Sequence, residues 1–304
     1  MFKTLIDCKT LSDNLANPDW AIIDTRFSLG DTSKGERDYH LSRIPGALYA
    51  HLDRDLSGAM EVGVTGRHPL PERNILTQTF SSWGISPETQ VVAYDDNIGA
   101  VAARLWWLAR WLGHERIAVL DGGFSAWNES GHKLATTSAS TCNQPTTAAT
   151  DETELLQSKP LLKNKPEPYP GKSALVELIN SDEAASGNWL LVDAREAERY
   201  AGVHEPIDSV AGHIPGAVNR AFAENIGSDK RFLAPAILRE RFTAVEQQAG
   251  DRPLAHYCGS GVTAAHNILA MVHAGLTPGA LYAGSFSEWI TKDGEQFSVA
   301  RLGD

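Results

Sequence analysis

The segment Cys258–Thr263 reads Cys-Gly-Ser-Gly-Val-Thr, and it separates two apolar stretches of different length. The preceding run, Leu254–Tyr257, is long enough for a buried strand, whereas the stretch from Thr263 to Ala274 has the length and period of a helix. A glycine-rich loop between a strand and a helix is typical of α/β folds, which bind ligands at the carboxyl ends of parallel strands. The segment therefore predicts an α/β fold with a candidate site at Cys258.

Much of the chain repeats an earlier part of itself, in the same order, which indicates a duplicated domain. The matched pairs are 22–26 with 191–195, 43–47 with 213–217, and 122–127 with 284–289. They include Asp-Thr-Arg against Asp-Ala-Arg, Ile-Pro-Gly-Ala in both copies, and Gly-Gly-Phe-Ser-Ala-Trp against Gly-Ser-Phe-Ser-Glu-Trp. In the first copy Asp95 stands where the second has Cys258, so only one copy keeps a thiol in its loop. This asymmetry predicts one active domain and one silent domain.

Within each copy, short apolar runs alternate with longer stretches of helical period. Continuous apolar runs suit strands that are covered on both faces, and we expect them at 21–23, 91–94, 117–120, 190–192, 254–257 and 280–282. Helices are expected at 72–83, 100–112, 236–248 and 263–274. Alternation of this kind predicts an α/β fold, with a mainly parallel sheet and helices on both faces in each domain.

Composition divides the chain and limits its partners. Residues 137–171 are rich in Thr, Ser, Ala, Pro and Lys and predict a linker between domains at 1–136 and 172–304. A net charge of −11 argues against nucleic acid and anionic membranes as partners, and no apolar run approaches the roughly 20 residues of a membrane span. The three cysteines, which are Cys8, Cys142 and Cys258, are too far apart for a disulfide framework or a metal cluster. We expect a cytoplasmic protein without a cofactor or metal.

The surroundings of Cys258 suit a reactive thiol. A loop that curls at Gly259 and Gly261 can point successive amide N–H groups inward, and the helix beginning near Thr263 adds the positive end of its dipole. Both effects favour the thiolate, which is the nucleophilic form. The alternative is a buried, inert cysteine, but nothing structural requires a thiol at that place, so we favour the reactive interpretation.

Two other cysteine chemistries fit the sequence less well. A cysteine phosphatase needs an arginine six positions after the cysteine to clamp phosphate, and that position is Ala264. A protease-like Cys-His pair would need His256 or His266, which flank the loop. Core packing or exposure at the surface is the expected role of both histidines.

Taken together, the duplicated Ile-Pro-Gly-Ala segment, the Gly-x-Phe-Ser-x-Trp segment and the Cys-Gly-Ser-Gly-Val-Thr loop resemble the two-domain rhodanese-type sulfurtransferases. The resemblance covers nearly the whole chain outside the linker. It implies two tandem rhodanese-like domains, the first catalytically silent with an acidic residue such as Asp95, and an active site between them. It also implies that Cys258 takes sulfane sulfur from a donor, becomes a persulfide and passes the sulfur to an acceptor.

The resemblance extends to the sulfur donor. The Cys258–Thr263 loop is similar to that of mercaptopyruvate-specific members, whereas thiosulfate-specific members resemble Cys-Arg-Lys-Gly-Val-Thr. A loop without cations suits 3-mercaptopyruvate, because thiosulfate carries two negative charges. One departure weakens this assignment. Mercaptopyruvate enzymes often carry a second arginine after a Glu-Pro pair, and here Ile207 follows Glu205-Pro206.

The implied site residues come from both domains. His68 and Asp53 match the family positions that form a proton relay with Ser260, although His68 could equally be an idle loop residue. Arg199 matches the arginine that holds the donor anion, and Arg67 is a possible substitute for the arginine missing at Ile207. The expected substrate-binding residues are Arg199, Arg67, Gly259, Gly261, Val262 and Thr263.

The sequence thus predicts a sulfurtransferase that moves sulfur from a small anionic donor, 3-mercaptopyruvate, to a thiol or cyanide acceptor, which could be a thioredoxin-like protein. Thiosulfate is the alternative donor. A non-enzymatic persulfide carrier or regulatory module is the alternative class of protein.

Overall fold

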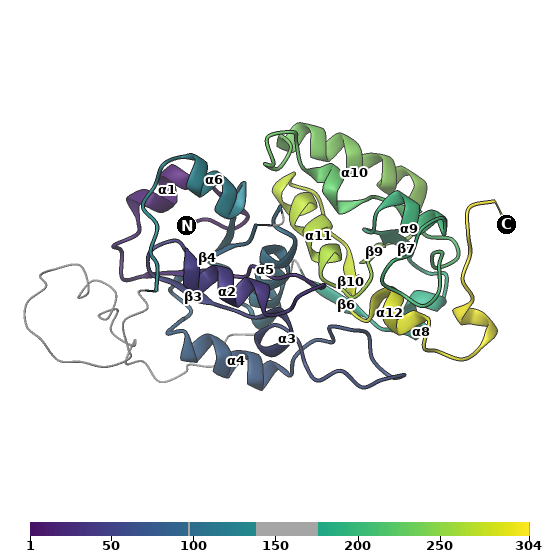
Figure 1. Ribbon diagram of the computed structural model, residues 1–304. Helices are drawn as coiled ribbons and strands as arrows, with labels where there is room; N and C mark the ends of the chain where they lie inside the picture. Colours follow the sequence, from purple (N-terminus) through teal and green to yellow (C-terminus); the bar gives the residue numbers. More distant parts are fainter. Residues whose placement is uncertain (97, 138–175, 304) are drawn as a thin grey trace, which may run out of the picture.

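The computed structural model describes residues 1–96, 98–137 and 176–303. The linker expected at 137–171 therefore lies outside the described residues, apart from its first position. Each of the two flanking regions folds around its own five-stranded sheet (Figure 1). In the described part of the chain, no helix is both long and apolar enough to cross a membrane.

The two sheets have the same architecture. The first consists of β1 (Leu5–Ile6), β2 (Trp20–Asp24), β3 (Ala47–Tyr49), β4 (Gln90–Tyr94) and β5 (Ile117–Leu120), in the order β1-β5-β4-β2-β3. The second consists of β6 (Glu177–Ile179), β7 (Leu190–Asp193), β8 (Val218–Asn219), β9 (Leu254–Tyr257) and β10 (Ala280–Tyr282), in the order β6-β10-β9-β7-β8. Every pairing in both sheets is parallel. The expected duplication and the parallel sheets are confirmed.

Helices cover both faces of each sheet, as expected. The first domain contains α1 (Cys8–Asp13), α2 (Lys34–Leu41), α3 (Leu52–Asp55), α4 (Arg73–Ser82), α5 (Ala100–Leu112) and α6 (Gly123–Glu129). The second contains α8 (Ser181–Ala185), α9 (Ala197–Ala201), η1 (Phe222–Asn225), α10 (Pro235–Ala249), α11 (Thr263–His273), α12 (Ser285–Trp289) and η2 (Glu295–Phe297). Buried side chains of α4 and α5 pack on one face of the first sheet and those of α1 and α6 on the other. In the second sheet, α10 and α11 cover one face, and α8 and α12 the other.

The two domains share a continuous apolar core between α5 and α11. Trp106 and Trp107 of α5 are fully buried, and they belong to the same cluster as Ile268 and Leu269 of α11. Both tryptophans are therefore part of the apolar core that the two domains share. The loops that follow β4 and β9 lead into these two helices, and residues of both loops line one cleft.

The repeated Asp-x-Arg segments form matched buried ion pairs. The guanidinium of Arg26 contacts Asp24 at 2.7 Å, and that of Arg195 contacts Asp193 at 2.7 Å. Each arginine also donates to a backbone carbonyl, of Ser42 in the first domain and of Gly212 in the second, at 2.6 Å. Because both the silent and the active copy have the pair, its role is to brace the fold.

Candidate active site between the two domains

Cys258 lies directly after β9, at the mouth of the loop that leads into α11, and is 2% exposed. The amide of Gly261 donates to its sulfur at 3.1 Å. Gly261 has φ +78°, and a Cβ atom there would lie 2.4 Å from the Ala283 carbonyl oxygen. Glycine is thus required at 261 by both conformation and space, and the loop turns an amide toward the sulfur as expected.

The hydroxyl of Ser285 fixes the backbone at Cys258 through hydrogen bonds. Its hydroxyl accepts from the Cys258 amide at 3.1 Å and donates to the Tyr282 carbonyl at 2.9 Å. Ser285 has φ +55°, a left-handed conformation that is costly for a non-glycine residue. The first copy has Gly123 at the matching position, with φ +58°. The active copy therefore tolerates backbone strain in order to place a hydroxyl at the cysteine, and sequence reasoning did not identify this residue.

In the first copy, the Asp95 carboxylate binds the amides of its own loop and of the first turn of α5. Its carboxylate accepts from the amides of Gly99, Val101 and Ala102 at 2.8, 2.8 and 2.9 Å. The side chain is 1% exposed. A fixed carboxylate thus holds the negative charge in the first domain, at the loop position where the second domain has a thiol.

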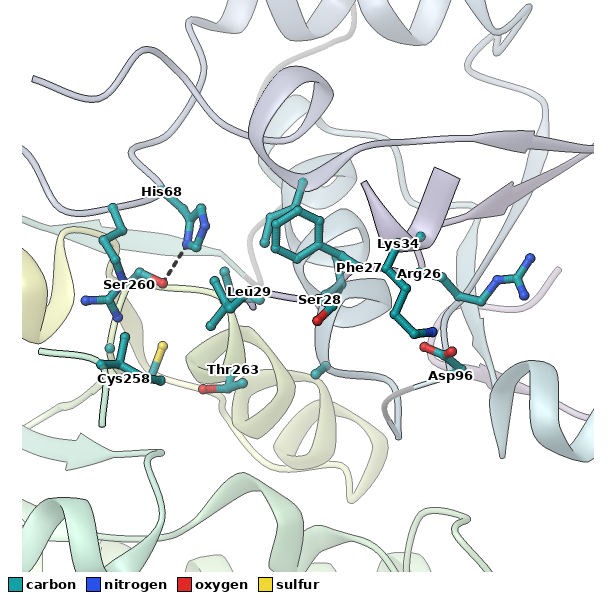
Figure 2. Close-up of a pocket in the computed structure, with 18 of the residues that line it drawn as sticks. Arg26, Phe27, Ser28, Leu29, Lys34, His68, Asp96, Cys258, Ser260 and Thr263 are labelled. Atoms are coloured by element: carbon teal, nitrogen blue, oxygen red, sulfur yellow. Dashed lines mark hydrogen bonds between the residues drawn. The ribbon is translucent and has the colours of Figure 1, made fainter. Parts of the chain in front are cut away.

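A cleft of about 420 Å³ opens above Cys258 and is lined by both domains (Figure 2). The second domain contributes Cys258, Gly259, Ser260, Val262, Thr263, Arg199 and Ile207. The first contributes, among others, Phe27, Leu29, Lys34, Arg67, His68 and Asp96. The cleft continues from Cys258 to the silent loop at Asp96, so it has room for more than one small ligand.

His68 reaches across the domain boundary to Ser260. Its Nδ1 lies 2.7 Å from the Ser260 hydroxyl, and its Nε2 lies 3.2 Å from an Asp53 carboxylate oxygen. Burial, together with the nearby charges of Arg104 and Arg67, lowers the pKa of His68 to about 3. The imidazole is therefore neutral at physiological pH. A neutral ring with its proton on Nε2 faces Asp53 as a donor and accepts from the Ser260 hydroxyl.

Two guanidinium groups approach the backbone next to the thiol. A Cβ atom on Gly259 would lie 2.7 Å from Arg67 Nη2 and 3.5 Å from Arg199 Nη2, so glycine at 259 leaves room for both arginines. The backbone of Arg67 is fixed in turn, because its amide donates to the Ser287 hydroxyl of α12 at 3.1 Å. The loop itself contains no cation, as its sequence indicates, but the fold brings two cations beside it.

Two carboxylates of the second domain hold these arginines. Asp208 is 9% exposed; it forms an ion pair with Arg67 and another with Arg199, at 2.9 Å in the second case. Glu205 accepts from Arg199 Nε at 3.1 Å. Ile207 stands where a second arginine was expected. It lies between Glu205 and Asp208 in the sequence, and its side chain lines the cleft. Glu205 also forms an ion pair with Arg195 at 3.2 Å, so the two carboxylates are shared among three arginines.

The structure places all ten predicted site residues in one region, and their catalytic roles stay predictions. Eight line the cleft, whereas Gly261 contacts the Cys258 sulfur and Asp53 contacts His68. Sequence reasoning missed Asp208, which carries no motif of its own. It also missed Arg104, for which a signal existed: it is an arginine in the strongly apolar helix α5.

The remaining candidates lie away from this chemistry. His256 and His266 are both fully buried, and burial lowers the pKa of each to about 4. His266 Nε2 contacts the Ile98 carbonyl at 3.1 Å, so it packs in the domain interface. Cys8 is buried in the first domain, and Cys142 lies outside the described residues. Among described residues, no group of three or more His, Cys, Asp and Glu side chains could hold a metal ion.

Comparison with known proteins agrees with this arrangement. The model of the rhodanese-like domain family matches residues 7–130 and again 174–292. A probable 3-mercaptopyruvate sulfurtransferase of Pseudomonas aeruginosa is 43% identical over 289 residues, which cover 94% of this chain and 95% of that protein. A putative thiosulfate sulfurtransferase, SseB, of Mycobacterium tuberculosis is 34% identical over 269 residues, covering 88% of this chain and 87% of that protein.

A solved structure gives the same result. The 3-mercaptopyruvate sulfurtransferase from Leishmania major superposes with a TM-score of 0.75 at 29% identity, covering 94% of this chain and 74% of that one. The two family matches fall on the two sheets described above, and the second of them contains the Cys258 loop. The chain therefore belongs to the rhodanese family, with two rhodanese-like domains in tandem.

Proposed function

We propose that the protein is a sulfurtransferase that moves a sulfur atom from 3-mercaptopyruvate, through a persulfide on Cys258, to a thiol or cyanide. The observation that carries this proposal is the position of Cys258. Its sulfur receives an amide hydrogen bond, and Cys258 lines a cleft together with two arginines and a hydroxyl–imidazole pair. Relatives named as enzymes of this class support it.

In the first half-reaction, the Cys258 thiolate attacks the sulfur of the donor. A sulfur–sulfur bond forms, the carbon–sulfur bond breaks, and its electron pair passes to the carbon, giving the enolate of pyruvate. The proton of the donor thiol then moves to that carbon, which converts the enolate into pyruvate. Ser260 and the neutral His68 are placed to pass this proton, with Asp53 at the far ring nitrogen. Arg199 and Arg67 would hold the donor carboxylate.

In the second half-reaction, an acceptor thiolate or cyanide attacks the outer sulfur of the persulfide. The sulfur–sulfur bond breaks, the acceptor leaves as a persulfide or thiocyanate, and the Cys258 thiolate is restored. The cleft extends beyond the thiol toward Phe27 and Leu29, which leaves room for an acceptor thiol, including one presented by a thioredoxin-like protein.

Thiosulfate is the second candidate donor, and one observation favours it. Two guanidinium groups beside Gly259 offer positive charge that the loop sequence does not. Asp208 and Glu205 offset this charge, which is the reason to place mercaptopyruvate first. Steady-state kcat/KM with the two donors side by side decides between them.

Intact-protein mass spectrometry after donor treatment tests the proposal. Wild type and Cys8→Ser should gain one sulfur atom, roughly 32 Da, because one activated thiolate carries the sulfur. Cys258→Ser should fold but gain nothing and transfer nothing. A sulfur adduct that survives in Cys258→Ser would overturn the assignment. If the protein forms a stable Cys258 persulfide but shows no steady-state turnover with either donor, the alternative of a non-enzymatic persulfide carrier is favoured.

A further inference from the structure

Arg104 is a fully buried arginine behind the candidate site. It lies in the second turn of α5 in the silent domain and is 0% exposed. Its guanidinium donates only to backbone carbonyls, and these belong to both domains. The acceptors are Gly261 at 3.2 Å, His68 at 3.1 Å, Leu56 at 3.4 Å and Pro69 at 3.4 Å.

In the part of the chain that the structure describes, no carboxylate compensates this charge. Arg104 forms no ion pair with Asp or Glu there, and its Nε has no hydrogen-bond partner. Burial lowers the pKa of Arg104 to about 10, and the negative charge of Cys258 acts in the opposite direction. The side chain is thus still charged at neutral pH. Because a buried ion without a counterion is costly, the fold needs a reason to keep it.

The neighbours of Arg104 supply that reason. Gly261, whose carbonyl accepts from Arg104, is the residue whose amide donates to the Cys258 sulfur. His68, whose carbonyl also accepts from Arg104, is the residue whose ring contacts Ser260. One guanidinium therefore joins the backbone of the thiol loop to the backbone of the imidazole segment across the domain boundary.

We propose that Arg104 is a positioning residue for sulfur transfer: it fixes the Cys258 loop against the His68 segment and provides the buried positive charge that stabilises the anionic sulfur of Cys258. The inference rests on the proposed function, since it concerns the same thiol. In a water-poor interior, a cation acts on a nearby anion much more strongly than it would at the surface. The charge therefore favours both the free thiolate and the persulfide anion.

Arg110 provides a matched control on the same helix. It is 1% exposed, and burial lowers its pKa as it does for Arg104. Its guanidinium donates to the Lys3 carbonyl at 2.8 Å and lies over the ring of Trp106, away from the cleft. Replacing either arginine removes a buried cation from α5, but only Arg104 contacts the thiol loop.

Other charged groups also face the thiol and must be kept constant in the test. Arg67 and Arg199 approach Gly259, and His68 approaches through Ser260. The carboxylates behind them are Asp208, Glu205 and Asp53. The informative variants therefore change position 104 alone.

The experiment is the pH dependence of Cys258 alkylation by iodoacetamide in the full chain, in a Cys8→Ser/Cys142→Ser background, with thermal unfolding as the check on folding. Alkylation reports the thiolate and needs no sulfur transfer, so its result is independent of the proposed function. Arg104→Met should move the midpoint of the pH profile upward by about one pH unit. At a pH below the midpoint, the alkylation rate constant should then be about tenfold lower than in wild type. Arg104→Lys, which keeps the charge, should recover most of this shift, and Arg110→Met should leave the profile unchanged.

A folded Arg104→Met with the wild-type profile would overturn the inference, as would an Arg104→Lys profile shifted as far as that of Arg104→Met. A second neutral variant, Arg104→Gln, is measured beside Arg104→Met in case the latter does not fold; its amide can still donate to a backbone carbonyl, but it carries no charge. An upward shift of its midpoint from the wild-type value supports the inference, and a wild-type midpoint contradicts it.

Discussion

The imidazole of His68 and the hydroxyl of Ser260 lie 2.7 Å apart, although the two residues belong to different domains. Neither domain alone can therefore assemble the hydroxyl–imidazole pair beside Cys258. The apolar core shared by α5 and α11 includes Cys258 itself, so the packing of the two domains also positions the thiol. The first domain has Asp95 where the second has a thiol, and it supplies His68 and Arg67 to the cleft.

The first prediction is that His68 is required for turnover. His68→Ala should lower kcat with 3-mercaptopyruvate by about 10² to 10⁴, the usual loss for a general acid–base group. Asp53→Asn should have a smaller effect, because Asp53 is partly exposed and contacts only the far ring nitrogen. Steady-state kinetics measure both.

The reaction of a preformed persulfide is the control for this variant. Cyanide attack on the Cys258 persulfide breaks no carbon–sulfur bond, so its rate should be nearly the same in His68→Ala as in wild type. If His68→Ala turns over 3-mercaptopyruvate at the wild-type rate, the proposed proton relay through His68 is wrong. The role proposed for Asp53 is then wrong as well.

The second prediction concerns the arginine pair. Arg67→Ala and Arg199→Ala should each raise KM for an anionic donor about ten- to a hundredfold, because a hydrogen bond to a charged group contributes roughly 1.5–3 kcal/mol. Equal effects would mean that Arg67, from the silent domain, takes the place of the arginine absent at Ile207. Arg252→Ala, at an exposed position that does not line the cleft, is the control. A KM that stays at the wild-type value in Arg67→Ala would leave Arg199 as the single donor contact.

The repeated parts of the fold were predictable, and the contacts between the domains were not. Buried strands such as β4 and β9 are continuous apolar runs, and they were found with errors of one residue at most. The strands β1, β3, β6 and β8 were missed. They have two or three residues each and, unlike the equally short β10, they are not buried along their whole length.

The same distinction applies to the site. The Cys258 loop is local, so its glycines and its position after a strand could be seen in the sequence. Asp208 could not be identified this way, because its partner Arg67 lies 141 positions away and meets it only after the domains pack. His68 was placed by resemblance to a family and not by any physical pattern.

The third prediction is a loss of stability on the acid side of neutrality. Burial lowers the pKa of His68 to about 3 and that of His114, His256 and His266 to about 4. In the unfolded chain these rings take up protons near pH 6.5, whereas in the folded protein they stay neutral. Acidification from about pH 6.5 toward 4 therefore stabilises the unfolded state, on the order of 1–2 kcal/mol per histidine by pH 5.

Urea denaturation at a series of pH values between 7 and 5 measures this loss. His256→Phe removes one titrating ring from β9 and should make the dependence on pH shallower. His204→Gln, at an exposed position, should leave the dependence as it is. A free energy of unfolding that is constant from pH 7 to pH 5 would contradict the assignment of neutral buried histidines.

The last prediction concerns Asp95, which replaces the thiol in the silent domain. Its carboxylate satisfies three buried amides at the start of α5. Asp95→Ala leaves these donors without an acceptor, so the free energy of unfolding should fall by about 2–4 kcal/mol, as expected for buried unsatisfied groups. Asp19→Ala, which removes an exposed carboxylate from the same domain, should change it little. Asp95 does not line the cleft, so the folded variant should still form the Cys258 persulfide at the wild-type rate. A variant as stable as wild type would show that the carboxylate does not hold the loop, whereas a stable variant with slow persulfide formation would give Asp95 a part in the reaction.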